Sequence, residues 1–153
     1  MSAITPEAVA TGRDPGQTLL LAWLLPGAGH WFAGLRGRAL LYGASVIGLF
    51  LAGLAMGGLV TASVYGHKWA FLLQMFNGPL AMAAAVGHYA ARQALAGAGA
   101  AAWLRNLVSP GPSPVADLGM TFTLVSAAFN VLVLADAYYL ADRPAEPTAE
   151  ASS

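Results

Sequence analysis

The sequence contains no cysteine and very few charged side chains. Without cysteine the chain can form neither a disulfide nor a thiolate metal site, and it has no cysteine nucleophile. Charged residues make up 9% of the chain, whereas soluble domains contain about 25%. So few charges cannot cover a water-facing surface. The composition therefore predicts that lipid is the solvent for most of the protein, so that the lipid bilayer is its first partner.

The chain also lacks an excess of either charge and lacks the common catalytic motifs. Seven basic residues balance seven acidic ones, which argues against nucleic acid as a partner. No Gly-x-Ser-x-Gly elbow, His-Glu-x-x-His helix, phosphate-binding loop or pair of catalytic carboxylates is present. His30 and His88, without a nearby carboxylate or thiolate, would be a poor zinc shell. We therefore predict no enzyme activity, no catalytic residue, no metal and no cofactor.

Long apolar segments dominate what is present, and hydrophobic residues make up 58% of the chain. They predict an all-α integral membrane bundle of four transmembrane helices within residues 17–141. The predicted spans are residues 17–35, 38–60, 68–91 and 119–141. Residues 92–118 form the long connection, in which 100–108 can form an interfacial helix. The tails, 1–16 and 142–153, are predicted to be disordered.

The first predicted span is interrupted by Pro26 and the glycines around it. Proline removes a helical hydrogen bond, so we favour a continuous span with a kink near residues 22–24. The alternative is a re-entrant segment, with a half-helix to Leu25 and a turn at Pro26–Gly29. Other helices would have to cover such a turn within a membrane.

Small and polar residues recur at helical spacing in the other spans. Ala44, Gly48 and Ala52 form one stripe of small residues, and Gly53 with Gly57 forms another. Such stripes favour close helix packing, or reflect only the Ala- and Gly-rich composition. In the third span the spacing places five residues on one inward-facing side of a helix: Gln74, Asn77, Ala81, Ala84 and His88. In the fourth span Thr123, Ser126 and Asn130 form a shorter polar stripe.

Asp136 is the one carboxylate inside a predicted span. Intramembrane acids are expensive and need partners. In the four-span topology Asp136 lies on the side of His67 and Lys68, which we predict as its partners. His30 is placed nearer the opposite side, so we predict no His30–Asp136 dyad. His30 is then a structural ring bonded to a carbonyl freed by Pro26, or a proton or ligand site.

The same topology gives the orientation. Four arginines lie in the loops of one side, against three basic residues on the side of the termini. The positive-inside rule then predicts that these loops are cytoplasmic and that both termini are outside. The four residues are Arg36, Arg38, Arg92 and Arg105.

Residues 26–38 read PGAGHWFAGLRGR, followed by a second apolar span. This pattern resembles the two-transmembrane-helix (TM-two) domain family, whose signature is Gly-x-Gly-His-aromatic-aromatic-x-Gly before basic residues. Residues 119–125, Asn130 and residues 136–138 are similar to the closing helix of an uncharacterised bacterial multi-span family. The resemblance implies a bacterial inner-membrane protein of unknown activity. The Asp-Arg-Phe element of the animal members is absent, so no receptor-linked role is carried over. The family-like positions are Pro26, Gly27, Gly29, His30, Gly34, Asn130 and Asp136.

Three functions remain open at this stage. The leading hypothesis is a non-enzymatic structural or assembly subunit, bound to itself or to other membrane proteins, because packing stripes are present and a catalytic constellation is not. The alternative is a small transporter or proton-coupled channel using His30, Asn130 and Asp136. A third, an intramembrane enzyme, lacks a pairing of nucleophile and base.

Overall fold

The computed structural model describes residues 13–64, 67–96, 102–108 and 110–143. Within these residues every regular element is a helix, so the all-α prediction is confirmed. The elements are α1 (Pro15–Leu24), α2 (Ala28–Phe32), α3 (Arg36–Gly57), the 3-10 helix η1 (Leu59–Ala62), α4 (Lys68–Gln74), the 3-10 helix η2 (Met75–Asn77), α5 (Pro79–Leu95), α6 (Ala102–Val108) and α7 (Pro114–Ala141).

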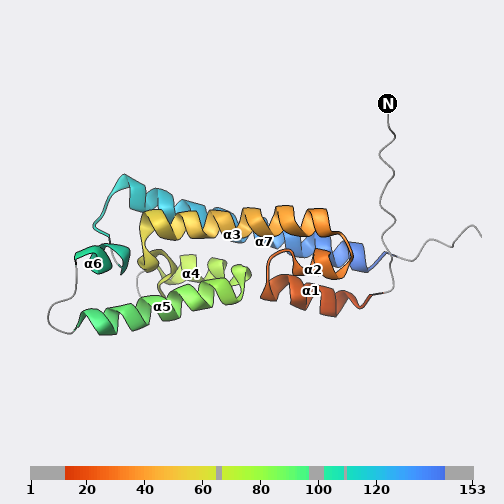
Figure 1. The fold of residues 1–153 in the computed structure, drawn as a ribbon, viewed down its shortest axis with the longest axis horizontal. Coiled ribbons are helices and arrows are strands. Elements are labelled where there is room, and N and C mark those ends of the chain that lie inside the picture. The colour runs from red at the N-terminus through yellow and green to blue at the C-terminus, as the bar shows by residue number, and fades with distance from the viewer. Residues whose placement is uncertain (1–12, 65–66, 97–101, 109, 144–153) are drawn as a thin grey trace, which may run out of the picture.

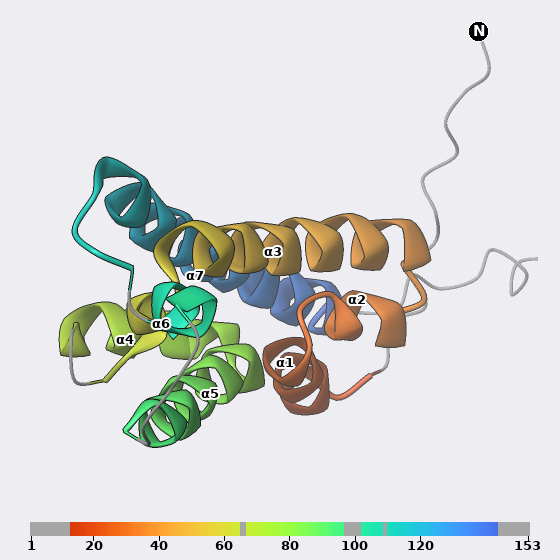
Figure 2. The same ribbon diagram turned by 60° about the vertical axis from the view of Figure 1, so that its left-hand side comes forward.

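Two long helices, α3 and α7, lie side by side and run in opposite directions (Figures 1 and 2). Among the described residues these are the two helices long and apolar enough to cross a membrane, where the sequence predicted four. Glycine sets how closely they approach. A Cβ on Gly53 would lie 2.7 Å from the Gly119 carbonyl oxygen of α7. The stripe of Gly53 and Gly57 therefore faces α7, whereas a Cβ on Gly48, in the other stripe, would meet no atom within 4 Å.

The segment predicted as the first span is a helical hairpin. Helix α1 begins with Pro15 in its first turn and with the Asp14 carboxylate accepting a hydrogen bond from the Gly16 N–H at 2.7 Å. It ends at Leu24, and α2 folds back against it (Figure 1). Gly27 has a φ of +89°, a left-handed conformation that turns the chain where a kink would only bend it. The prediction of one kinked helix over residues 17–35 is therefore wrong, and the alternative of a half-helix and a turn describes the structure.

The segment predicted as the third span, residues 68–91, is a second hairpin. Its first arm is α4 with η2, and its second arm is α5, which begins at Pro79. Gly78, with a φ of +59°, turns the chain between them. Pro79 therefore starts a helix and does not kink one. The prediction of a continuous third helix is wrong.

The two hairpins approach from opposite ends and meet at their turns, alongside the α3–α7 pair (Figures 1 and 2). The Trp23 indole N–H donates to the Met75 carbonyl oxygen at 3.1 Å. A Cβ on Gly78 would collide with the Trp23 carbonyl oxygen, so only glycine allows this approach. The meeting point joins residues more than fifty positions apart in the sequence.

This architecture separates the four arginines that were predicted to share one side. Arg36 and Arg38 begin α3, at the end where α7 finishes. Arg92 lies in the last turn of α5, and Arg105 lies in α6 at the other end (Figure 1). The grouping was wrong because each hairpin returns the chain to the end from which it entered. Of the segments predicted as disordered, residues 1–12 and 144–153 lie outside the described residues.

Candidate functional site

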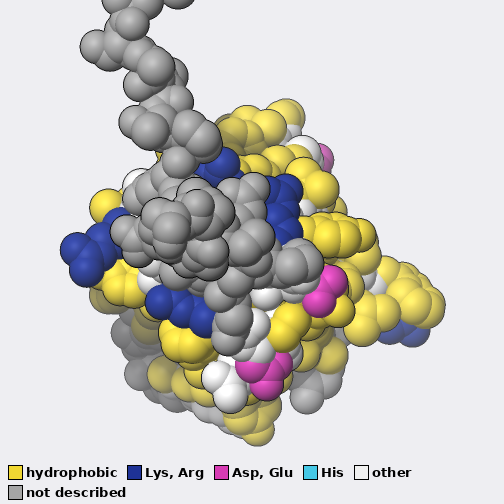
Figure 3. All heavy atoms as spheres, turned by 90° about the vertical axis from the view of Figure 1, so that its right-hand side faces the viewer, with side chains coloured by type: hydrophobic (Ala, Val, Ile, Leu, Met, Phe, Trp, Pro, Cys, Tyr) yellow, Lys and Arg dark blue, Asp and Glu magenta, His cyan; other side chains and the backbone are white. Residues whose placement is uncertain are grey.

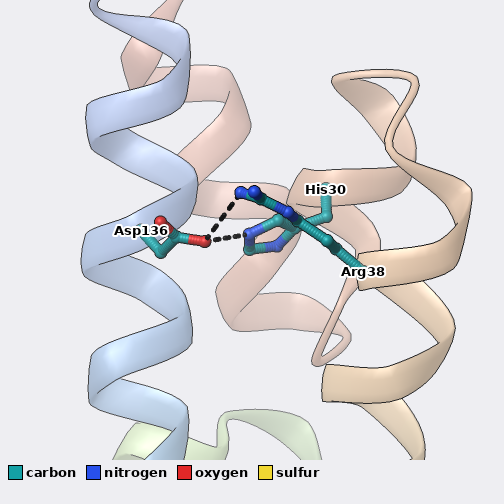
Figure 4. Close-up of polar contacts among 3 residues, drawn as sticks. All are labelled: His30, Arg38 and Asp136. Carbon is teal, nitrogen blue, oxygen red and sulfur yellow. Dashed lines mark hydrogen bonds and ion pairs between the residues drawn. The ribbon is translucent and has the colours of Figure 1, made fainter. Parts of the chain in front are cut away.

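The most distinctive polar contact joins α2 to α7. The His30 side chain is fully buried, and its Nε2 lies 2.9 Å from Oδ2 of Asp136 (Figure 4). The short helix α2 presents His30 to α7 because Gly29, beside it, packs against Ala22 and Ala137. The Tyr42 ring of α3 meets the His30 ring edge-on, with 4.9 Å between their centroids. The position of the His30 ring is therefore determined by three helices, α2, α3 and α7.

Arg38 adds a positive charge to this pair. Its Nη1 lies 4.0 Å from the same Asp136 oxygen (Figure 4). The Asp136 side chain is 39% exposed, so the pair lies at the edge of the molecule, and Oδ2 of Asp136 faces both the buried ring and the exposed guanidinium. We name His30, Asp136 and Arg38 the α2–α7 cluster.

The α2–α7 cluster corrects two predictions. His30 and Asp136 do form a pair, and the partners of Asp136 are His30 and Arg38, not His67 or Lys68. The partners of Asp136 were mispredicted because residues 17–35 were expected to form one span. A hairpin returns His30 to the end where α7 finishes, whereas a single span would have carried it away. His67 and Lys68 instead lead into α4, in the other hairpin.

The cluster can share and exchange a proton, because an imidazole and a partly exposed carboxylate are in hydrogen-bond contact. Nδ1 of His30 is buried and has no hydrogen-bond partner among the described residues. No set of three His, Asp or Glu side chains suitable for a metal ion occurs in the described part of the chain.

A second polar set, the amide network, holds the second hairpin to α7. The Gln74 amide donates to the Thr61 carbonyl at 3.0 Å and to Oγ1 of Thr123 at 2.9 Å. The Asn130 amide donates to the Phe76 carbonyl at 2.7 Å. The three polar residues predicted as a stripe on α7 are all buried and all form hydrogen bonds with the second hairpin: Thr123, Ser126 and Asn130.

The third amide contributes through a relay. The Asn77 amide donates to Oγ of Ser126 at 3.2 Å, and the Ser126 hydroxyl donates to the Val46 carbonyl of α3 at 2.8 Å. This relay therefore links the turn of the second hairpin to both long helices. The amide network consists of Gln74, Asn77, Asn130, Thr123 and Ser126.

Each amide in the network leaves its oxygen unused. Oε1 of Gln74 and Oδ1 of Asn77 and Asn130 are buried and have no hydrogen-bond partner within the part of the chain that the structure describes. The orientation of Gln74 and Asn130 is set by carbonyl oxygens, which can only accept, so their nitrogens must face those carbonyls. Buried oxygens without donors are costly, and they attract water or a cation.

The remaining predicted positions serve the backbone or lie elsewhere. Gly27 faces the backbone of Ala39, and Gly43 lets the Pro26 carbonyl approach α3. Gly34 has a φ of +86° and turns the chain from α2 into α3. His88 is buried on α5 and has no hydrogen bond to either polar set among the described residues. Gln74 and Asn77 point inward as predicted, but the turn at Gly78 separates them from His88.

Sequence reasoning missed Tyr42 and Thr61. Tyr42 follows Arg38 by four residues, which places both on one face of α3. That spacing was a usable signal once His30 was known to return to α3. Thr61 contributes its backbone carbonyl, and a pattern of side chains cannot predict such a contact.

Comparison with known proteins places the chain in a family without giving it an activity. No curated protein and no solved structure matches it. Residues 17–147 match the sequence model of a family of unknown function, DUF6677. The match begins in α1 and extends past the end of α7, so it includes both hairpins, the α2–α7 cluster and the amide network. The chain therefore belongs to the family of unknown function DUF6677.

Proposed function

We propose that the chain is an integral membrane protein in which α3 and α7 cross the bilayer. The two hairpins are then re-entrant segments that enter from opposite sides. Helix α3 has 22 residues, or about 33 Å at 1.5 Å per residue, enough for a hydrocarbon core of about 30 Å. Only 28% of the most apolar stretch of α3, and 39% of that of α7, is buried. The core helix of a soluble protein would be mostly buried.

The observation that carries this proposal is the distribution of polar and apolar side chains. Among the residues that the structure describes, ten polar side chains are buried, including those of Gln74, Asn77 and Asn130. Large apolar side chains are exposed on every long helix, such as Leu40, Val86 and Leu132. A water-soluble fold places these classes the other way round, whereas lipid favours this arrangement. The bacterial inner membrane is the location that the TM-two resemblance implies.

Alkaline carbonate washing tests the membrane location. The protein, produced in a bacterial host with an affinity tag, should stay in the washed inner-membrane pellet and enter solution only with detergent. A known peripheral protein and a known integral protein serve as controls. Release of most of the protein by carbonate alone would overturn the proposal.

Within the membrane we propose a non-enzymatic structural or assembly role. This is supported by the use of the polar side chains, since the amides of Gln74, Asn77 and Asn130 each bind the second hairpin to a neighbouring helix. The stripe of Ala44, Gly48 and Ala52 on α3 offers a packing face, and a Cβ at Gly48 would meet no atom of the described residues within 4 Å. Gly48→Leu should therefore leave the fold intact and weaken self-association, measured as mass by light scattering in mild detergent. A parent protein that is monomeric and binds no other membrane protein would contradict this role.

A small transporter or proton-coupled channel is the second candidate, using His30, Asn130 and Asp136. It is favoured by the three unpartnered amide oxygens and by helices that break where the hairpins meet, because transporters bind ions and substrates at such breaks. The test is proton and Na⁺ flux in liposomes with the parent, Asp136→Asn and Asn130→Leu. Absence of flux in the parent, or equal flux in all three proteins, removes this candidate.

A further inference from the structure

An open apolar groove of about 580 Å³ lies between the first hairpin and α3. Its walls include Leu25 and Pro26 at the turn, Trp31 and Phe32 of α2, and Leu40 and Ala44 of α3. On α3 the lining runs from Ala39 to Ile47, about 12 Å at 1.5 Å per residue. The groove therefore extends from the end of the molecule, where α3 begins, towards the depth at which the hairpins meet.

Two arginines lie at the outer end of this groove. The Arg36 guanidinium carbon lies 5.6 Å from the centre of the Trp31 ring, and that of Arg13 lies 4.9 Å from the centre of the Phe32 ring. Both rings line the groove. Figure 3 shows that Lys and Arg side chains gather on this end of the molecule, beside apolar surface. A cationic mouth thus adjoins an apolar wall.

These two arginines differ from Arg38 in having no acidic partner. Arg38 lies near Asp136, but neither Arg13 nor Arg36 has a carboxylate within 4.0 Å among the described residues. Nη1 of Arg13 is buried and has no hydrogen-bond partner in residues 13–64, 67–96, 102–108 and 110–143. A buried guanidinium nitrogen without an acceptor is costly, and phosphate is an acceptor that arginine binds strongly. The outer end of the groove, at Arg13 and Arg36, is therefore suited to bind an anion.

We propose that the groove is a binding site for an anionic phospholipid. One acyl chain lies against α3 and the turn of the first hairpin, and the phosphate group is bound by Arg13 and Arg36. This inference rests on the proposed membrane location, which presents the groove to acyl chains and its mouth to headgroups. The arginines together with the apolar wall favour a lipid over a soluble anion, because a soluble anion would leave the apolar part of the groove uncovered.

Native mass spectrometry of the full chain, released from detergent with equal amounts of phosphatidylglycerol and phosphatidylcholine, tests the site. The parent should retain phosphatidylglycerol preferentially. Each arginine near a membrane surface is worth about fivefold in affinity for an anionic lipid. Arg13→Gln with Arg36→Gln should therefore lower the preference by about 25-fold or abolish it, whereas Arg92→Gln with Arg105→Gln, at the other end, should leave it unchanged. An unchanged preference in the first double variant would overturn the proposal.

A second pair of variants tests whether an acyl chain occupies the apolar part of the groove. Ala44→Phe fills the groove without changing charge and should reduce retention of both lipids at this site, whereas Ala55→Phe, on an exposed position of α3 outside the groove, should not. Equal retention in these two variants would contradict the acyl-chain assignment. Displacement of phosphatidylglycerol by millimolar inorganic phosphate would show that the ligand is a free anion, which also overturns it.

Two further controls keep the outcomes separate. Should the Arg13 and Arg36 double variant lose its folded elution profile, Arg36→Gln alone carries the test, because that side chain is exposed. A protein that carbonate releases from the membrane fails the proposed function. A protein that stays in the membrane but retains the two lipids equally fails only this inference.

Discussion

At the scale of single residues, the pair of His30 and Asp136 is the polar contact between the first hairpin and α7, beside the apolar packing of Ala22 against Leu134 and Ala137. The His30 ring is fully buried, and Nδ1 already lacks a partner, so losing Asp136 would leave both ring nitrogens unpaired. Asp136→Leu should therefore lower the free energy of unfolding by about 1–3 kcal/mol, the cost of an unsatisfied buried polar group. Asp136→Asn should cost less, since its amide oxygen can still accept from the imidazole. Unfolding in detergent, followed by helical circular dichroism, measures both.

A double-mutant cycle separates this contact from the other effects of each substitution. His30→Leu and Asp136→Leu, alone and combined, should show a coupling of about 0.5–3 kcal/mol, as expected for residues in direct contact. Ser45→Ala, an exposed position on α3 that bonds only its own helix, is the matched control and should add independently to Asp136→Leu. Full additivity of the two Leu substitutions would show that the pair contributes nothing to stability.

At the scale of the elements, the left-handed glycine at each turn makes a hairpin where the sequence suggested a helix. Gly27 has a φ of +89°, and a Cβ there would collide with the Ala39 carbonyl oxygen. Gly27→Ala should therefore destabilise the fold by about 2–5 kcal/mol, combining about 1–2 for the left-handed conformation with about 1–3 for overpacking. The measurement is the same unfolding transition.

Two other glycines test the reason for this loss. Gly34 shares a positive φ but has open space around it, so Gly34→Ala should show the conformational cost alone. Gly48 lies within α3 and meets nothing, so Gly48→Ala should stabilise by about 0.5–1 kcal/mol through helix propensity. Equal losses at Gly27 and Gly34 would show that contact with α3 is unimportant.

The elements also show how far a sequence can be interpreted. Apolar composition predicted helices, and spacing predicted that Gln74 and Asn77 face inward, because both depend on local periodicity. Whether proline and glycine bend a helix or reverse it depends on what covers the freed backbone, and that is a tertiary property. Gly43 leaves room for the Pro26 carbonyl because it has no side chain, but nothing in the sequence indicated that it lies opposite this turn. The pairing of His30 with Asp136 was mispredicted for the same reason.

At the scale of the whole molecule, the two hairpins meet tip to tip alongside a pair of long helices. Helix α1 has ten residues, or about 15 Å, which is half of a hydrocarbon core of about 30 Å. Neither arm of the first hairpin can cross a bilayer alone. The Trp23–Met75 hydrogen bond and the contact of Gly78 with Trp23 join the turns near the middle, where unpaired backbone groups would be most costly. In the membrane location proposed above, the two ends of each hairpin are expected to lie on the same side of the bilayer.

The absence of cysteine makes this topology directly measurable, since any cysteine introduced is the only one. Gln17→Cys and Gly37→Cys, both exposed, flank the first hairpin, and Lys68→Cys and Gln93→Cys flank the second. We expect a membrane-impermeant maleimide, added to intact cells or to inverted vesicles, to label the first two positions from one side and the other two from the opposite side. Four continuous spans would instead separate residue 17 from residue 37, because an odd number of crossings lies between them. Labelling of these two positions from opposite sides would show that the first hairpin opens into a span in the bilayer, and each variant's unfolding transition must match the parent's for its label to count.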